Sequence, residues 1–149
     1  MLTNNLKKII SSRLSATNGI VLLTNTDGTT YQNSTVYSIP SNYSPSTTTN
    51  GDCYIAVGSG NTTPTPNDSA LESEITGLDN IGNVINSGEN GATWTATLTN
   101  TTNTPVTISE YGLYVMSGSK YKMLTRTVLR NPIILEVGEI ANITINISQ

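Results

Sequence analysis

Between Ala92 and Leu98, apolar residues alternate with threonines without exception. A period of two residues is that of a β-strand with one face buried and the other in water, because successive side chains of a strand point to opposite faces. Similar segments follow over Val106 to Met116, Lys120 to Leu129 and Ile143 to Ile147, separated by proline and glycine. This spacing predicts a mainly β domain, a single antiparallel β-sandwich with an immunoglobulin-like or jelly-roll-like arrangement.

The composition limits how such a domain builds its core. The chain has 149 residues, which suits one domain, and only 36% of them are hydrophobic, with no phenylalanine. Isoleucine, leucine and valine must therefore fill the interior around the single tryptophan, Trp94. Because a sandwich core is only about 10 Å thick, this supply is sufficient. The 11% of charged residues is low for a disordered chain, which supports a folded domain.

The N-terminal region carries a helical pattern instead. Its apolar residues fall on one face of a helix: Leu2, Leu6, Ile9, Ile10 and Leu14. Thr3 is available as an N-cap, and Gly19 is placed to end the helix. We therefore expect a helical arm over residues 1–18 and the β-sandwich domain over residues 19–149.

Three local signals organise the first half of the predicted domain. Asp27 and Gly28 predict the tight turn of a first hairpin. The segment from Cys53 to Val57 has the composition of a buried strand. Ser69 and Glu72 have the spacing of a capping box, which predicts one short internal helix between Asn67 and Ile75.

The residue types that most enzymes need are scarce. The chain has no histidine and one cysteine, Cys53, so the usual general base and a structural zinc site are both missing. Gly58 and Gly60 lack the lysine and the third glycine of a phosphate-binding loop, so they predict a turn. We therefore expect no enzymatic activity, no cofactor and no metal.

Acidic residues are the remaining candidates for chemistry. One group lies on the predicted internal helix and just after it, where solvated carboxylates are the expected interpretation: Asp68, Glu72, Glu74 and Asp79. Glu110 is different, because it lies within an apolar strand where an ionised carboxylate needs a partner. Arg126 is on the strand predicted to return through the turn at Gly118. The two residues predict a structural ion pair that sets the strand register, with a subunit contact as the alternative.

The basic residues are confined to the two ends of the chain: Lys7, Lys8, Arg13, Lys120, Lys122, Arg126 and Arg130. Because nucleic-acid binding requires clustered cations, we expect no nucleic-acid partner. No segment approaches the roughly 20 apolar residues of a membrane helix, so we expect no membrane partner. The predicted N-terminal helix either offers a surface to another protein or carries solvated charges, and its residues for such a contact are Leu2, Leu6, Lys7, Lys8, Ile10 and Arg13.

Four ordered segments follow one another from Cys53 onward: Tyr54-Ile-Ala-Val-Gly58-Ser-Gly60, Leu71-Glu-Ser-Glu74-Ile75, Ile108-Ser-Glu110-Tyr-Gly112-Leu113-Tyr114 and Met123-Leu-Thr-Arg126. Together they resemble small virion proteins of tailed bacteriophages, including tail-collar fibre-type domains and capsid-associated β-domains. The resemblance implies a structural component of the virion, assembled in the host cytoplasm, and most simply a capsid decoration or head-associated protein. It also implies other virion proteins as partners, such as the major capsid protein or tail and connector proteins, and a homo-oligomer.

Two alternatives stay open. Within the same class, the chain is a tail fibre, collar or baseplate adaptor protein. In a different class, it is a carbohydrate-binding module in which Tyr31, Tyr37, Tyr43 or Trp94 stacks on a sugar ring.

Overall fold

The chain folds into a mainly β domain. The computed structural model describes residues 1–7, 21–33, 42–43, 52–88, 91–117 and 120–148. The strands in these ranges are β1 (Val21–Thr24), β2 (Thr30–Asn33), β3 (Asn42–Tyr43), β4 (Asp52–Gly58), β5 (Asp79–Gly88), β6 (Gly91–Thr99), β7 (Val106–Ser117), β8 (Lys120–Leu135) and β9 (Ile140–Ser148).

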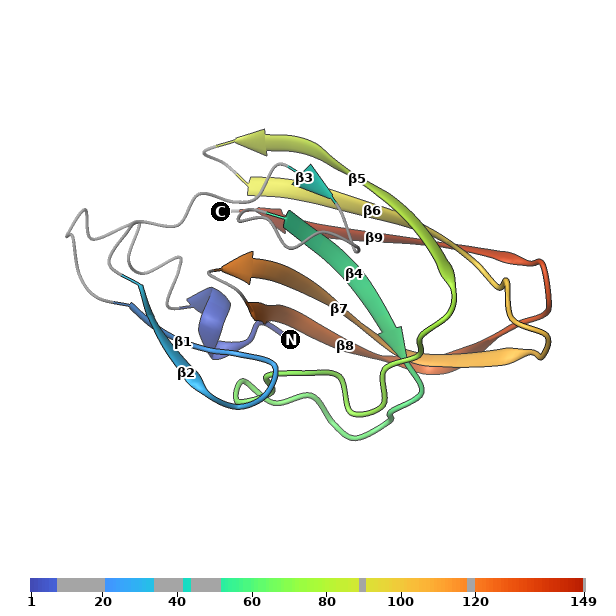
Figure 1. Ribbon diagram of the computed structural model, residues 1–149, viewed down its shortest axis with the longest axis horizontal. Coiled ribbons are helices and arrows are strands. Elements are labelled where there is room, and N and C mark those ends of the chain that lie inside the picture. The colour runs from blue at the N-terminus through green and yellow to red at the C-terminus, as the bar shows by residue number, and fades with distance from the viewer. Residues whose placement is uncertain (8–20, 34–41, 44–51, 89–90, 118–119, 149) are drawn as a thin grey trace.

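The strands form three sheets of different size. The four-stranded sheet has the order β3-β4-β7-β8, the three-stranded sheet has the order β5-β6-β9, and β1 pairs with β2 in a separate hairpin. The short β3 runs parallel to β4, and the other pairings are antiparallel. In Figure 1 the three-stranded sheet lies above the four-stranded sheet, and the turn from β8 to β9 lies at the right-hand end of the molecule.

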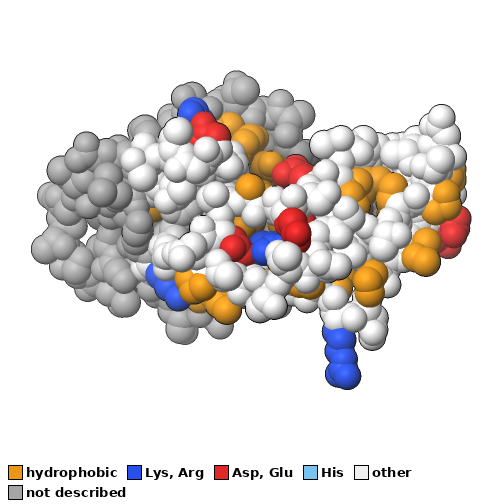
Figure 2. Space-filling view, turned by 90° about the horizontal axis from the view of Figure 1, so that it is seen from below, with side chains coloured by type: hydrophobic (Ala, Val, Ile, Leu, Met, Phe, Trp, Pro, Cys, Tyr) orange, Lys and Arg blue, Asp and Glu red, His pale blue; other side chains and the backbone are white. Residues whose placement is uncertain are grey.

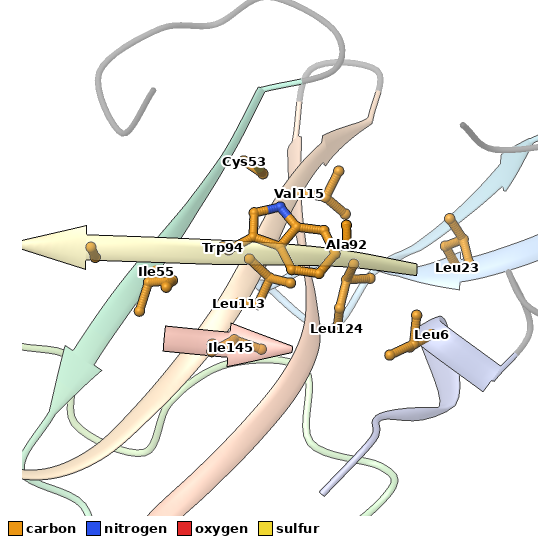
Figure 3. Close-up of a cluster of buried hydrophobic side chains, with 11 residues drawn as sticks. Leu6, Leu23, Cys53, Ile55, Ala92, Trp94, Leu113, Val115, Leu124 and Ile145 are labelled. Carbon is orange, nitrogen blue, oxygen red and sulfur yellow. The ribbon is translucent and has the colours of Figure 1, made fainter. Parts of the chain in front are cut away.

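The main hydrophobic core receives side chains from both larger sheets. Trp94 of β6, with 1% of its surface exposed, lies among residues of the four-stranded sheet such as Leu113 and Leu124 (Figure 3). Along β6 the buried residues alternate with half-buried and exposed threonines, as the sequence predicts. Leu23 of the β1–β2 hairpin joins the same core, so the hairpin packs on the domain.

The other face of the four-stranded sheet is covered by an extended segment, here called the covering loop, that runs from Ser59 to Leu78 between β4 and β5 (Figure 1). Leu71 of this loop packs against Ala56, Tyr114 and Met123 in a second apolar cluster. The loop is also joined to β4 by backbone hydrogen bonds. This cover buries side chains of β7 and β8 that would otherwise face water.

The predicted internal helix is absent from this loop. Residues 66–67 form a turn, and the segment from Asn67 to Ile75 has no helical residues. The Asp68 side chain makes local bonds instead: its carboxylate accepts from the Thr65 N–H at 3.0 Å and from the Thr65 hydroxyl at 2.6 Å. Such local bonds compete with helix formation, which explains why the capping-box spacing misleads here.

The described part of the N-terminal region is only partly helical. Leu2 pairs with Thr125 as a β-bridge at the edge of β8, and residues 4–7 form one helical turn. Thr3 caps that turn, because its hydroxyl accepts from the Leu6 N–H at 3.5 Å. Residues 8–18 of the predicted arm lie outside the described residues.

Other local predictions agree with the structure, with one exception in β8. The Asp27-Gly28 turn joins β1 to β2, and Cys53 is buried in β4. Pro132, however, lies inside β8 and does not end it. The strand tolerates this proline because β8 is an edge strand and its register with β7 shifts at this point.

Candidate functional site

The most unusual feature of the interior is a buried group of charges under the covering loop. Glu110 of β7 is fully buried, and Arg126 of β8 is 3% exposed. The Arg126 Nε donates to Glu110 Oε2 at 2.7 Å. The structure therefore brings together the two residues that the sequence predicts as a structural ion pair, on neighbouring strands joined by one hairpin.

Two acids of the covering loop complete this group. Arg126 Nη1 donates to Asp68 Oδ2 at 2.8 Å, and Arg126 Nη2 lies 3.5 Å from Glu72 Oε2. We call Arg126, Glu110, Asp68 and Glu72 the charge cluster. In Figure 2, which looks onto the covering loop, basic and acidic groups meet near the middle of the face.

The expectation of a solvated carboxylate is therefore wrong for Asp68, whose side chain is only 17% exposed, whereas Glu72 keeps 39% of its side chain exposed while it contacts Arg126. The signal in the sequence was Arg126 itself, because a buried guanidinium has five N–H donors and a single carboxylate cannot satisfy them all. Asp68 and Glu72 are far from Arg126 along the chain, so spacing alone could not identify them as its partners.

The carboxylates of the charge cluster also hold the backbone of the covering loop. Glu110 Oε1 accepts from the Gly60 N–H at 3.2 Å and from the Ser73 N–H at 2.9 Å. Glu72 Oε2 accepts from the Asn61 and Thr62 N–H groups, each at 2.9 Å. The cluster thus fastens both halves of the loop to the sheet.

Gly58 and Gly60 make room for this arrangement. Gly58 pairs directly with Glu110 across β4 and β7. A Cβ atom at either glycine would lie 2.5 Å from Glu110 Oε1. The two glycines therefore serve the close approach of a carboxylate to the backbone, a role that the turn interpretation of this motif did not include.

The surroundings shift the pKa values of these acids in different directions. Burial acts to raise the pKa of Asp68, but hydrogen bonds from Thr65 and Arg126 outweigh it, so the pKa is lowered. The N–H and hydroxyl of Thr62 lower the pKa of Glu72. Burial, together with the negative charge of Glu110, raises the pKa of Glu74. Asp68 and Glu72 are thus held as anions beside Arg126.

A pocket of about 440 Å³ lies between β4, the end of the covering loop and the start of β5. Its lining residues include Glu74, Asp79, Asn80 and Tyr54. The Tyr54 ring also stacks on Tyr114, with ring centroids 5.2 Å apart. The pocket thus combines acidic, amide-bearing and aromatic residues in its lining.

The residues predicted to contact a partner from the N-terminal helix have different environments. Leu6 is 5% exposed and packs into the main core of its own chain, so it is not available to a partner. Leu2 is 40% exposed, and Lys7 is on the surface. Lys8, Ile10 and Arg13 lie outside the described residues.

The structure also corrects one residue of the carbohydrate-binding alternative. Trp94 is 1% exposed and lies in the main hydrophobic core, so it is not available to stack on a sugar (Figure 3). The side chains of Tyr31, Tyr37 and Tyr43 lie outside the described residues.

Within the described ranges, no three cysteine, aspartate or glutamate side chains are grouped as metal ligands. No helix in the same part of the chain is long and apolar enough to cross a bilayer. Comparisons of the chain with protein families, with curated proteins and with solved structures found no match.

Proposed function

We propose that this chain is a structural component of a tailed-phage virion, a decoration protein that coats the capsid. The proposal starts from the resemblance of the motifs between Tyr54 and Arg126 to virion β-domains. Its main structural support is an apolar surface at one end of the domain. A buried charge cluster that is satisfied internally adds to that support.

The apolar end is formed where β8 turns into β9. Its exposed aliphatic residues lie within one short stretch of chain: Ile133, Ile134, Val137 and Ile140, which are 44%, 62%, 54% and 58% exposed. Figure 2 shows hydrophobic side chains on the surface at this end. Concentrated exposed apolar surface is typical of protein-interaction sites. We infer that this end docks on a neighbouring virion protein.

The charge cluster supports a mechanical role over a catalytic one. The guanidinium of Arg126 is shared by Glu110, Asp68, Glu72 and Thr62, and the carboxylates accept further bonds from loop backbone. Charges engaged in this way stiffen a fold, because each bond restrains two segments. A rigid domain with an apolar end is suited to a structural protein that docks on its neighbours.

We further propose that the two larger sheets form a single sandwich. The shared core around Trp94 supports this arrangement, since it combines residues of β4, β7 and β8 with residues of β6 and β9. The Asn80 side chain adds a hydrogen bond from β5 to the Ile55 carbonyl of β4 at 2.8 Å.

The test is the location and copy number of the chain in purified particles. A decoration protein is expected among the most abundant proteins after the major capsid protein, and imaging should place it on the head. A few copies at the tail would instead identify an adaptor. Absence from particles would overturn the virion proposal.

A matched pair of variants tests the docking surface. Ile134→Asp at the apolar end should reduce occupancy on particles at least about tenfold, because burying an unpaired charge costs several kcal/mol. Ile81→Asp, at a residue 67% exposed in β5, should leave occupancy unchanged. Equal effects of the two variants would contradict docking through the apolar end.

Carbohydrate binding is the second candidate, and the pocket beside Glu74 favours it. Its volume lies within the range of small-molecule sites, and the acids Glu74 and Asp79 in its lining can accept hydrogen bonds from hydroxyls. A glycan array probed with the chain should then show binding that Asp79→Ala removes. No binding to any glycan would exclude this candidate.

A further inference from the structure

Strand β9 is an edge strand. It pairs with β6 along its whole length, from Ile140 opposite Thr99 to Ser148 opposite Gly91. Among the residues that the structure describes, no strand pairs with its other edge. Such an edge presents a row of backbone N–H and C=O groups that can accept a further strand.

The other long edges carry features that discourage such pairing, and β9 does not. β8 contains lysines, arginines and Pro132, and part of its edge is covered by Leu2. β5 begins with Asp79 and has a register irregularity between Ile85 and Gly88. The sequence of β9 is Ile-Ala-Asn-Ile-Thr-Ile-Asn-Ile-Ser, without charge or proline, and its pairing with β6 is regular.

The centre of β9 reads the same in both directions. Asn142, Ile143, Thr144, Ile145 and Asn146 are symmetric about Thr144. If two copies of β9 paired antiparallel with a two-fold axis at Thr144, each asparagine would face an asparagine and each isoleucine an isoleucine. Facing threonines can hydrogen-bond across antiparallel strands, and no like charges would meet in this pairing.

The burial of β9 fits this pairing. Asn142, Thr144 and Asn146 are exposed on the outer face, while Ile143 and Ile147 are only partly buried against the main core. A neighbouring copy of β9 would cover the open side of these isoleucines and extend the polar outer face across both chains.

We propose that two copies of this chain associate through antiparallel pairing of their β9 strands. The three-stranded sheets then join into one continuous sheet with the order β5-β6-β9-β9-β6-β5. The interface is isologous, as in most homodimers. This inference depends on β9 alone and would stand even if the chain belonged to no virion.

Sedimentation equilibrium of the purified chain tests the proposal. The wild type should show a concentration-dependent dimer. Thr144→Lys should weaken association at least about tenfold, because the two lysines would face each other at the axis. Asn83→Lys is the matched control: it is exposed on β5 of the same sheet and should leave the dimer unchanged. A wild-type monomer at all concentrations would overturn the proposal.

Charge complementation makes the test specific to the axis. Thr144→Glu should also be monomeric, and mixing it with Thr144→Lys should restore dimers, since opposite charges then meet. No heterodimer in this mixture, or loss of the dimer only in Asn83→Lys, would contradict pairing through β9.

Disulfide trapping answers the question even if a charged variant fails to fold. Facing residues of antiparallel strands lie about 4.5–5.5 Å apart between Cα atoms, which a disulfide can span. Thr144→Cys should therefore form a covalent dimer on mild oxidation, whereas Asn83→Cys should not. The native Cys53 is buried and serves as the background in both variants.

Discussion

At the scale of single residues, Glu110 and Arg126 show how a polar pair is accommodated inside an apolar sheet. Removing both charges from water is costly, and their attraction repays that cost only when the remaining donors and acceptors are also bonded. Here Glu110 accepts from Arg126, Gly60 and Ser73. The Nη1 of Arg126 donates to Asp68, and its Nη2 donates to the Thr62 hydroxyl and to Glu72. The fold accommodates the buried pair because both carboxylate oxygens of Glu110 and the guanidinium nitrogens of Arg126 have hydrogen-bond partners.

Glu110→Ala should therefore destabilise the domain strongly. The variant leaves Arg126 buried without its nearest carboxylate, and we expect the free energy of unfolding to fall by about 3–5 kcal/mol. Denaturant unfolding of the isolated chain measures this. Glu136→Ala, at an exposed acid near the β8–β9 turn, should change stability by less than about 0.5 kcal/mol. Similar losses of unfolding free energy in the two variants would show that the Glu110–Arg126 ion pair does not stabilise the domain.

The pH dependence of stability follows from the acids beside Arg126. The folded-state pKa values of Asp68 and Glu72 are lowered, so their stabilisation is fully present above their unfolded pKa values. It is lost as the pH falls below about 4, through the folded values. The raised pKa of Glu74 acts in the opposite direction, since its folded form binds a proton more readily. We expect a net loss of stability on acidification.

Two variants separate these contributions in unfolding measurements between pH 6 and pH 2. Asp68→Asn should make the acid-side decline shallower, because one lowered pKa is removed. Glu74→Gln should make it steeper, because the opposing contribution is removed. A decline unchanged in Asp68→Asn would show that the link with Arg126 does not govern acid stability.

At the scale of elements, the covering loop is held by backbone bonds within itself and to β4, and by Glu110 of the more distant β7. The Ser59 N–H donates to the Ser73 carbonyl, and the Ile75 N–H donates to the Val57 carbonyl, each at 2.8 Å. Between these bonds Glu110 reaches the loop backbone past Gly58. The loop therefore forms an ordered layer over the sheet. This packing requires glycine at position 58, because a Cβ atom there would collide with Glu110 and with the Ser73 carbonyl.

Gly58→Ala should loosen this layer. The new Cβ would lie 2.5 Å from both the Ser73 carbonyl oxygen and Glu110 Oε1, so the loop must move. We expect a loss of about 1–3 kcal/mol, typical of overpacking. Amide hydrogen exchange should become faster at Ser59 and Ile75. Thr63→Ala, which changes an exposed side chain of the same loop, should leave the exchange of Ile75 unchanged. Equal protection in Gly58→Ala would contradict the close-approach role.

At the scale of the whole molecule, Trp94 links the two larger sheets. Its indole is 1% exposed and belongs to a cluster that contains Ile55 and Leu113 of one sheet and Ile145 of the other. If the two sheets form the single sandwich proposed above, neither can separate without exposing the apolar surface of both. The single tryptophan therefore reports on the contact between them.

Unfolding followed by Trp94 fluorescence should coincide with unfolding followed by far-ultraviolet circular dichroism. The first probe senses the contact between the sheets and the second senses the strands, so one cooperative unit gives equal midpoints. Two separated transitions would show that the sheets unfold independently and would contradict the single-sandwich proposal.

The sequence alone determined the features that depend on neighbouring residues. The alternation around Trp94 specified a strand with one buried face, and Asp27 with Gly28 specified a hairpin turn. Glu110 and Arg126 could be paired because they lie on the two arms of one hairpin. Each of these signals is local, since strand periodicity and turn geometry involve only nearby backbone.

Only the tertiary structure decided which distant segments share a buried site. It placed Asp68 and Glu72 against Arg126, although the same residues are equally compatible with a solvated helix. It also buried the Leu6 side chain in the main core of its own chain. The physical reason is that the cost of burying a charge or an apolar side chain depends on everything packed around it. A pattern of nearby residues does not contain that information.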